Sequence, residues 1–339
     1  VLAMSFVDTS FQRNPLAFEI YRRLGGWAPE TRYVNLRWGS KDFGLYYIGE
    51  KVQFSPGRLQ LPSEGSGDGI LLQIDWPKAG ERSVKSKTTG TTFQVAFPKN
   101  VTHQQLGYIQ QLVDEVDGRA AAGVHSPEAA KSLEEVLDFA SFTRYFMLQE
   151  LAIDLDGYAF SDYVEVKDGR LSHAAPWDYD LAFGFACKPD YRRNALTGHT
   201  SSGVEGWNVE NVRDAMTRWS AIGFQTTKAH RNMRQLFLNL WRTPSFAAYF
   251  VAAWRSARQG PLRDDALEEM VSRRSSRISA SAWRDLAIWH DAERCGFFPC
   301  CYAEDAQDFA SAERHLAEFL RRRAKWMDAH AGELPDNGH

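Results

Sequence analysis

The chain has 339 residues, of which 44% are hydrophobic and 24% are charged, and this ordinary globular composition excludes a mainly disordered protein. Its 40 basic and 43 acidic residues give a net charge of −3. This balance argues against a protein that chiefly binds nucleic-acid phosphates, which require an excess of basic groups. No run approaches the about 18 consecutive apolar residues of a membrane-spanning helix, so no membrane span is predicted.

Residues 1–100 are expected to form a β-rich part around one early helix. The apolar opening Val1–Met4 suggests a strand that begins upstream, so further N-terminal strands are expected to be missing from this sequence. Asp8-Thr9-Ser10 offers N-cap oxygens to a helix over Pro15–Leu24, where apolar residues recur every fourth position. Aromatic and β-branched runs predict strands. The expected strands are 33–38 and 43–48, which a Gly-containing turn joins as a hairpin, and also 70–74 and 92–97.

Residues 101–335 are expected to be mainly helical. Thr102 and Gln105 have the spacing of a capping box ahead of an apolar helix face. A second helix is predicted over 127–151, and a short hairpin follows, with strands 163–166 and 171–174 around Asp168-Gly169. The sequence from 226 to 330 has an almost wholly helical pattern. Four tryptophans in helical stretches are interpreted as packing residues, namely Trp254, Trp283, Trp289 and Trp326.

The four cysteines do not define a disulfide scaffold in a chain of this length. Three of them lie close together, yet their spacing, including that to His290, does not match the paired ligands of a zinc site. Disulfides and free thiols both remain open, and with them the cellular compartment. The cysteines are Cys187, Cys295, Cys300 and Cys301.

The stretch from 151 to 185 carries the most chemical information, because it combines six aspartates with aromatic residues. Asp178 and Asp180 are two residues apart, and their carboxylates converge if the chain bends there. Such pairs suit Mg²⁺, which prefers oxygen ligands. Asp156 lies 22 residues upstream of Asp178, across the predicted hairpin. This spacing allows a base and a metal ligand to face each other, as in protein kinases.

A simpler interpretation of the same residues is also open. Aspartates favour solvated turns, and Asp168-Gly169 is expected to be one. Trp177 and Phe183 are equally well explained as core residues. Gly157, beside Asp156, suggests a loop that faces solvent.

Two motifs in this stretch resemble the signature of the CotH family, the spore-coat protein H kinases and their relatives. They are Asp-Gly-Tyr at 156–158 and Pro-Trp-Asp-Tyr-Asp-Leu-Ala-Phe-Gly at 176–184. The likeness covers most of the chain, because other segments also resemble family motifs. These are the early helix start at 8–17, the Gly-x-Tyr…Glu strand at 44–50, the helix with Ser141 and Glu150, and the closing helix with Arg323 and Trp326.

The resemblance implies an α+β, atypical protein-kinase-like fold with two lobes, one over 1–100 and one over 101–335. It also implies binding of ATP and Mg²⁺ and phosphorylation of Ser or Thr in protein substrates. Carried over by position, Asp156 is the catalytic base and Asp178 the metal ligand, with Asp180 as a further ligand or an assisting group. From the family alone, a spore-coat, cell-surface or secreted location is suspected.

Three more residues are assigned to nucleotide binding, each with an alternative. Glu50 either orients a phosphate-contacting Lys or Arg, as the Lys–Glu pair of kinases does, or is an exposed acid at a strand end. Arg13 either contacts phosphate, since a guanidinium fits phosphate oxygens well, or pairs with an acid of the fold. Trp177 either lines the nucleotide site or belongs to the core.

The sequence departs from the family pattern at three positions. Asp154 and Ser161 stand where many relatives have Asn, and Ser is a poorer Mg²⁺ ligand than Asn. Gln73 stands where relatives often have an acid.

Two other function classes remain open. A non-catalytic coat protein or adhesin of the same family would need no Mg-ATP, because fold does not determine function. A glycoside hydrolase would place two acids around a sugar cleft.

Overall fold

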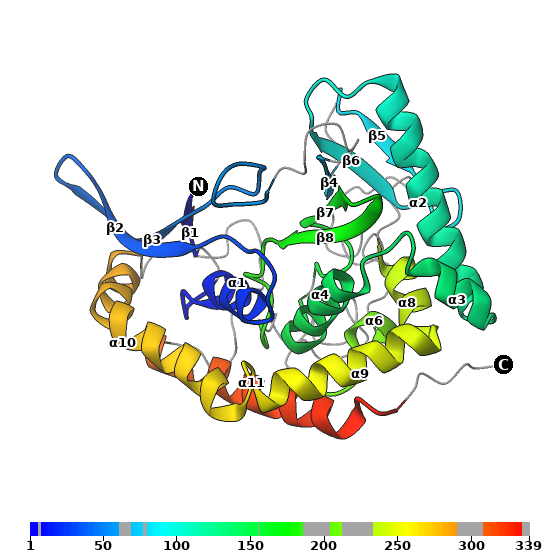
Figure 1. Cartoon of the computed structure of the whole chain (residues 1–339). Coiled ribbons are helices and arrows are strands. Elements are labelled where there is room, and N and C mark those ends of the chain that lie inside the picture. The colour runs from blue at the N-terminus through cyan, green and yellow to red at the C-terminus, as the bar shows by residue number, and fades with distance from the viewer. Residues whose placement is uncertain are drawn as a thin grey trace.

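The computed structural model describes residues 1–5, 8–60, 69–76, 80–154, 156–185, 204–211, 233–289 and 308–333. Two antiparallel sheets lie beside a large set of helices (Figure 1), so the predicted α+β class is confirmed. One sheet has three strands in the order β1-β3-β2, and the other has five in the order β5-β6-β4-β7-β8. The four cysteines lie outside the described residues. No helix in the described ranges is long and apolar enough to cross a membrane.

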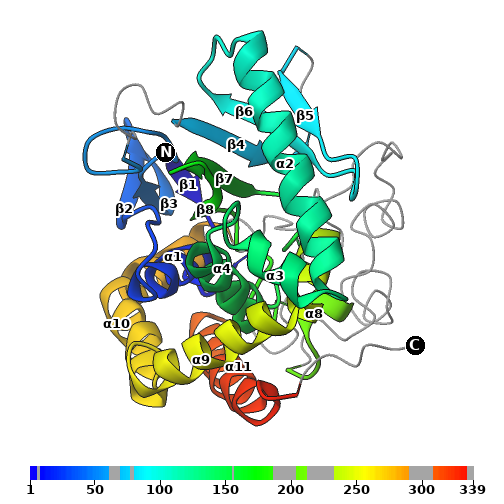
Figure 2. The ribbon, with the colours of Figure 1, turned by 45° about the vertical axis from the view of Figure 1, so that its right-hand side comes forward.

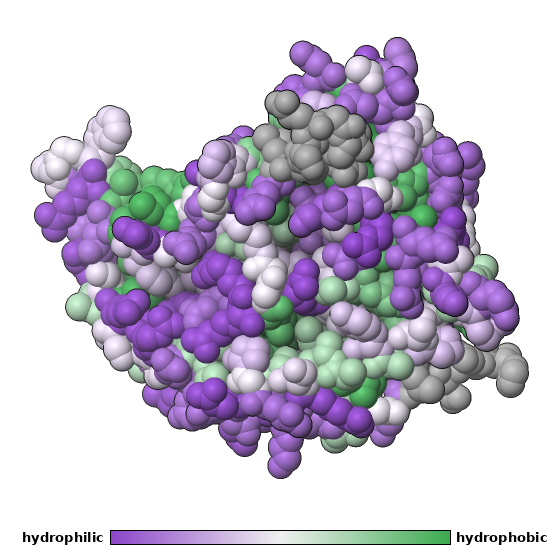
Figure 3. Space-filling model, viewed as in Figure 1, coloured by the Kyte–Doolittle hydropathy of each residue, from purple (hydrophilic) through white to green (hydrophobic). Residues whose placement is uncertain are grey.

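The three-stranded sheet is formed by β1 (Leu2–Met4), β2 (Thr31–Trp38) and β3 (Lys41–Gly49), which confirms the predicted first hairpin. One face packs on helix α10 (Asp264–Ile288), where Leu45 contacts a cluster that includes Ile278. On the outer face, Leu2 is paired with Ile48, and both are exposed. Apolar side chains are visible at this end of the molecule in Figure 3. The helical part therefore supports this sheet from one side.

Docking of β3 on α10 depends on a glycine. Gly44 has φ of +87°, and a Cβ at this position would overlap the Asp285 carboxylate. That carboxylate accepts a hydrogen bond from the Leu45 amide at 2.7 Å. Trp289 Nε1 donates to the Phe43 carbonyl at 3.2 Å. The absence of a side chain at Gly44 thus lets β3 approach the helix closely.

The five-stranded sheet brings together strands from both sides of residue 100. It consists of β4 (Ile70–Ile74), β5 (Ser83–Lys85), β6 (Thr92–Phe97), β7 (Asp162–Lys167) and β8 (Arg170–Pro176). The predicted second hairpin is confirmed as β7–β8, and its turn residues Asp168 and Gly169 both have positive φ. Strand β4 lies before residue 100 and pairs with β7, which lies after it. The division of the chain into two lobes at residue 100 stays a prediction.

Helix α2 (His103–Gly123) begins at the predicted capping box and packs along β5 (Figure 2). The single helix expected over 127–151 is wrong, because the chain forms α3 (Pro127–Leu133) and α4 (Phe139–Ala152). Between them the backbone bonds to β8, where the Leu171 amide donates to Val136 O at 2.8 Å. The Asp138 side chain then caps α4 by accepting from the Ala140 amide. Pairing with the sheet thus interrupts the helical pattern.

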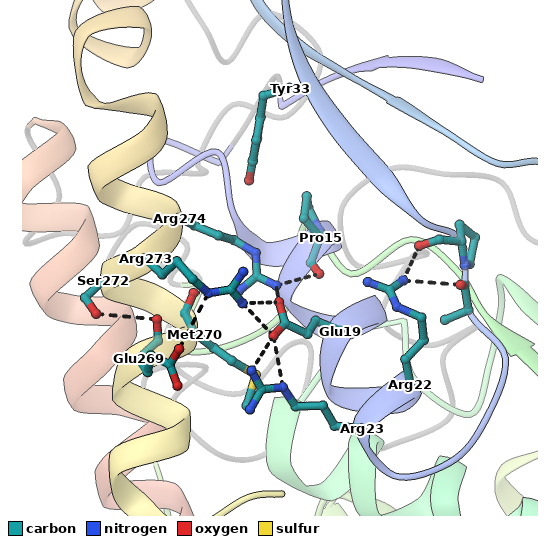
Figure 4. A network of polar contacts seen from close by, with 12 residues as sticks. Pro15, Glu19, Arg22, Arg23, Tyr33, Glu269, Met270, Ser272, Arg273 and Arg274 are labelled. Carbon is teal, nitrogen blue, oxygen red and sulfur yellow. Dashed lines mark hydrogen bonds and ion pairs between the residues drawn. The ribbon is translucent and has the colours of Figure 1, made fainter.

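Helix α1 (Arg13–Arg23) begins two residues before the predicted start. Its N-cap residue Gln12 makes no side-chain cap, but Asp8 Oδ2 accepts a hydrogen bond from the Arg13 amide at 2.9 Å. Glu19 of α1 binds Arg23 and two arginines of α10, Arg273 and Arg274 (Figure 4). Burial alone would raise the pKa of Glu19, but these guanidinium groups lower it overall. The ion pairs fix α1 against α10.

Helix α4 lies at the centre of the main core, and its residues from Met147 to Ala152 are all buried. It packs against α1, α9 and β8 (Figure 1). The described part of 226–330 is helical, as predicted. The remaining helices are α6 (Asn208–Asn211), α8 (Arg234–Arg242), α9 (Pro244–Gln259) and α11 (Phe309–His330).

The four tryptophans of the helical part differ in their surroundings. Trp254 is 1% exposed, which confirms its packing role, and Trp326 packs on the core. Trp289 is half-buried and contacts β3. The interpretation of Trp283 as a packing residue is wrong, because it is 47% exposed on α10. Helical spacing alone did not distinguish the face of α10 that meets the core.

Candidate active site

The loop after α4, called the base loop (residues 153, 154 and 156–161), carries the predicted base Asp156. Helix α4 ends at Ile153, which has the left-handed φ of +46°. Asp156 follows, and its carbonyl accepts hydrogen bonds from the Ala159 and Phe160 amides at 3.0 and 3.1 Å. The expectation of a solvent-facing loop is wrong, because Gly157 is buried and Asp156 is half-buried. The backbone around Asp156 is therefore held by a tight turn against the core.

The loop after β8, called the metal loop (residues 177–185), carries the predicted metal ligands Asp178 and Asp180. Asp178 has φ of +63°, which bends the chain directly after the strand. Tyr179 is fully buried, and its amide donates to Asn14 Oδ1 of α1 at 2.6 Å. Farther along, the Phe183 amide donates to the Ala152 carbonyl at the end of α4 at 2.7 Å. Both acidic loops are thus attached to the same end of α4.

Left-handed backbone is concentrated in these two loops. A non-glycine residue with positive φ is uncommon, and its cost persists only where the surrounding structure enforces it. In the described part of the chain, seven non-glycine residues have positive φ, and five of them belong to the two acidic loops: Ile153, Tyr158, Ser161, Asp178 and Phe183. Such clustering is typical of functional sites.

A further acidic residue lies at this end of the sheet, directly after β4. In the register of the three neighbouring strands, Ile74 pairs with Asp162, and Asp162 pairs with Pro176. Asp75, which follows Ile74, therefore lies at the sheet end from which Asp178 projects. Gln73 Nε2 donates to Asp75 Oδ2 at 2.7 Å. No sequence motif indicated Asp75, although an acid directly after a predicted strand, two residues beyond Gln73, was a usable signal.

The carboxyl groups interact electrostatically across the two loops. Burial raises the pKa of Asp154 well above its usual range, and Asp156, Asp178 and Asp180 raise it further. Burial likewise raises the pKa of Asp180, followed by the effects of Asp178, Asp156 and Asp8. Asp154 is 2% exposed, and its Oδ1 has no hydrogen-bond partner. Carboxyl groups from both loops are thus crowded within electrostatic reach of one another.

Asp178 is the most accessible member of this group. It retains exposed surface, although the protein around its carboxyl raises its pKa, as does Asp75. Hydrogen bonds with Asp180 and Ser161 act in the opposite direction. Asp178 and Asp180 are therefore neighbours, and Ser161 reaches Asp178 from the base loop.

The donor set fits Mg²⁺ that is bound together with phosphate. Within the described residues, no three His, Cys, Asp or Glu side chains are arranged to hold a metal ion by themselves. Mg²⁺ usually takes only one or two carboxylates and completes its shell with waters and substrate phosphates. The Asp178–Asp180 pair meets this requirement, and the unpartnered Asp154 oxygen lies in the same negative environment.

The three-stranded sheet faces this cluster through Tyr47 of β3. Burial raises the pKa of Tyr47, and Asp178, Asp180 and Asp8 raise it further. The Tyr47 hydroxyl is therefore within electrostatic reach of the aspartates in the neighbouring loops. Both parts of the chain thus contribute to the surroundings of the site.

Arg13 is buried beside the metal loop. It forms an ion pair with Asp8, and its Nε donates to the Ala182 carbonyl at 2.8 Å. Its Nη2 has no hydrogen-bond partner. The pairing with an acid, which the sequence left open, is present. Phosphate contact by Arg13 stays a prediction.

Glu50 contacts Arg58 and Glu30, whereas Trp177 directly precedes Asp178 in the chain. Glu50 Oε1 is 3.5 Å from Arg58 Nε, and Oε2 accepts from the Glu30 amide at 3.0 Å. Glu50 thus contacts an arginine, which is one of the two expected partner types. Neither of these described contacts involves the aspartates of the two acidic loops. Trp177 stacks on Phe18 with ring centroids 6.0 Å apart and packs against the core. A role of either residue in nucleotide binding stays a prediction.

Comparison with known proteins adds one finding. The family model described as CotH kinase protein matches residues 1–327. A search of curated proteins found no match.

Proposed function

Since the chain belongs to the CotH kinase family, we propose that it is a protein kinase that transfers the γ-phosphoryl group of ATP to a Ser or Thr hydroxyl. One observation carries this proposal beyond family membership. Aspartates from two strained loops, after α4 and after β8, converge at the end of one hairpin and perturb one another's pKa. Perturbed carboxyl groups gathered in this way are typical of catalytic sites.

Asp156 is proposed as the general base. Its carboxylate would orient the acceptor hydroxyl and accept its proton as the oxygen attacks phosphorus. The turn fixes the backbone from which this side chain projects, because the Ala159 and Phe160 amides bind the Asp156 carbonyl. Its half-buried position leaves surface that an acceptor side chain can reach.

Asp178 and Asp180 are proposed to hold Mg²⁺. When bound, Mg²⁺ and ATP supply the transferable phosphoryl group and a positive charge that offsets the developing negative charge. Asp178 keeps exposed surface and accepts a hydrogen bond from Ser161. Ser161 would thus orient a metal ligand in this chain, instead of binding the metal as the Asn of many relatives does.

The substitution of Asn by Asp154 is compatible with the proposed activity. Burial and three neighbouring carboxyl groups raise the pKa of Asp154 and favour its protonated form. A protonated carboxyl is neutral and has one O–H donor, so it resembles an asparagine side chain in charge and in hydrogen bonding.

The test compares three Asp→Asn variants. Asp178→Asn should abolish Mg²⁺-dependent ATP binding measured by calorimetry. Asp156→Asn should keep ATP binding and lower phosphate transfer to a Ser-rich peptide by about 10²–10⁴-fold, the usual contribution of a general base. Asp168→Asn is the matched control, because Asp168 lies in the exposed turn of the same hairpin. It should retain both properties.

Other outcomes would contradict the proposal. A wild-type protein that binds no Mg-ATP would favour a non-catalytic surface protein. Loss of ATP binding in Asp156→Asn would make Asp156 a ligand. Full transfer by that variant would remove it from the chemistry.

A further inference from the structure

Gln149 lies in the last turn of α4, between the two acidic loops. Its side chain is buried, and its Nε2 donates to the hydroxyls of Tyr145 and Tyr179, both at 2.8 Å. Its Oε1 is buried without a hydrogen-bond partner. This oxygen lies against the Gly157 backbone so closely that a Cβ on Gly157 would overlap it.

The orientation of this amide follows from its neighbours. The Tyr145 hydroxyl donates its single proton to Asp162, so it can only accept from Gln149. The NH₂ group must therefore face the two tyrosines, and the carbonyl oxygen must face Gly157. An unsatisfied buried oxygen costs free energy, and here it accompanies a close contact with the base loop.

Through this arrangement one side chain touches both acidic loops. Gly157 directly follows Asp156. Tyr179 stands between Asp178 and Asp180, and its amide is bonded to Asn14. A shift of the Gln149 amide would therefore move the base loop and the metal loop relative to each other.

We propose that Gln149 is a positioning residue, which fixes the separation between Asp156 and the Asp178–Asp180 pair. The inference rests on the proposed kinase function for its catalytic consequence, but not for its structural one. Phosphoryl transfer depends on placing the base and the metal ligands together, and a misplacement of about 1 Å can cost 10²-fold in rate. Loosening this link should therefore lower kcat.

The test uses two variants that break this link, meaning the contacts of the Gln149 amide with Gly157 and Tyr179, and one matched control. Gln149→Met keeps the side-chain volume and removes the amide, and Tyr179→Phe removes one hydroxyl. Tyr21→Phe is the control, because the Tyr21 hydroxyl is equally buried but bonds His173 Nδ1 at 2.8 Å instead of Gln149. All three variants should lose a similar few degrees in melting temperature.

Hydrogen exchange provides a readout that does not depend on activity. In Gln149→Met, and more mildly in Tyr179→Phe, amide exchange should accelerate together in segments 156–161 and 178–185. It should stay near wild type there in Tyr21→Phe. Acceleration in one segment alone, or equal acceleration in the control, would overturn the proposal whether or not the protein is a kinase.

Kinetics then test the catalytic consequence. The two link variants should lower kcat on the order of 10–100-fold, whereas Tyr21→Phe should keep it. The Gln149→Met/Tyr179→Phe double variant should be little worse than Gln149→Met, because both changes break one link. Unchanged kcat in link variants of an active wild type refutes the positioning role alone. An inactive wild type contradicts the proposed function instead.

Discussion

The buried ion pair between Arg323 of α11 and Glu150 of α4 should be the most sensitive single contact in the helical part. Both side chains are fully buried. Arg323 Nε donates to the Glu150 carbonyl at 2.7 Å, and Nη1 donates to the carbonyls of Val204 and Gly206 at 2.9 and 2.7 Å. Its guanidinium carbon lies 4.6 Å from the Trp326 ring centroid. The guanidinium group therefore combines an ion pair, hydrogen bonds to three carbonyls and a contact with an aromatic ring.

Glu150 links this cation to the base loop. Its carboxylate accepts hydrogen bonds from the Tyr158 hydroxyl at 2.7 Å and from the Asn208 and Val209 amides at 2.5 and 2.9 Å. Burial raises the pKa of Glu150, although Arg323 and these hydrogen bonds oppose the shift. Burial lowers the pKa of Arg323 to about 10. Each charge is thus tolerated mainly because the other is present.

Arg323→Met replaces the cation by an unbranched apolar side chain and leaves Glu150 buried without its partner. Removal of one member of a buried pair costs about 3–5 kcal/mol, and the carbonyls of Val204 and Gly206 lose their donor as well. We expect the free energy of unfolding to fall by at least about 3 kcal/mol in urea denaturation at pH 7. The Arg323→Met/Glu150→Met double variant should lose less than the sum of its parts, because no charge stays unpaired.

The neighbouring arginine is a matched control. Arg322 is exposed and lies 3.9 Å from Glu318, one helical turn away. Arg322→Met should change the free energy of unfolding by no more than about 0.5 kcal/mol. If Arg323→Met were as mild as this control, the buried pair would not stabilise the helical part, and the reasoning from burial and hydrogen bonding would be refuted.

Three further predictions test other parts of the fold. Burial raises the pKa of Glu165 to about 7 from 4.5, so the folded state keeps a proton that the unfolded state has released. The contribution of Glu165 to the free energy of unfolding should therefore fall by about 3 kcal/mol as pH rises from 4.5 to 7, at about 1.36 kcal/mol per pH unit. In urea titrations at pH 5 and pH 8, Glu165→Gln should remove this contribution, so that the fall between the two pH values is smaller than in the wild type. Gly44→Ala should destabilise by at least about 2 kcal/mol, since it adds left-handed strain and displaces Asp285. Trp254→Ala should lower the free energy of unfolding by about 3–5 kcal/mol, whereas Trp283→Ala on the exposed face should change it by less than about 0.5 kcal/mol.

Local signals in the sequence predicted the parts of the fold that are formed locally. The capping box at Thr102 and the turn at Asp168-Gly169 involve residues within a few positions of each other, so spacing was sufficient. The break between α3 and α4 depends on pairing with Leu171, more than 30 residues away. No local pattern around 134–138 contained that information.

The candidate site shows the same distinction. The motifs predicted which aspartates belong to it, and the structure places Asp156, Asp178 and Asp180 within electrostatic reach of one another. Asp75 joins them only through strand register, and Gln149 only through tertiary packing. The contact of Gln149 produces no spacing that can be recognised along the chain, whereas for Asp75 the signal was an acid directly after a predicted strand.

The end of α4 explains how one helix organises both the site and its support. Consecutive residues on a helix point about 100° apart, so Gln149 and Glu150 reach in different directions. Gln149 contacts the base and metal loops, whereas Glu150 binds Arg323 and, through Tyr158, the far side of the base loop. The crowded carboxylates and left-handed residues of the site oppose folding, and these two neighbouring side chains connect the strained loops to the most deeply buried part of the core. Rotation of this last turn would displace both connections at once, so the geometry of the acidic loops depends on how α4 ends at Ala152 and its cap Ile153.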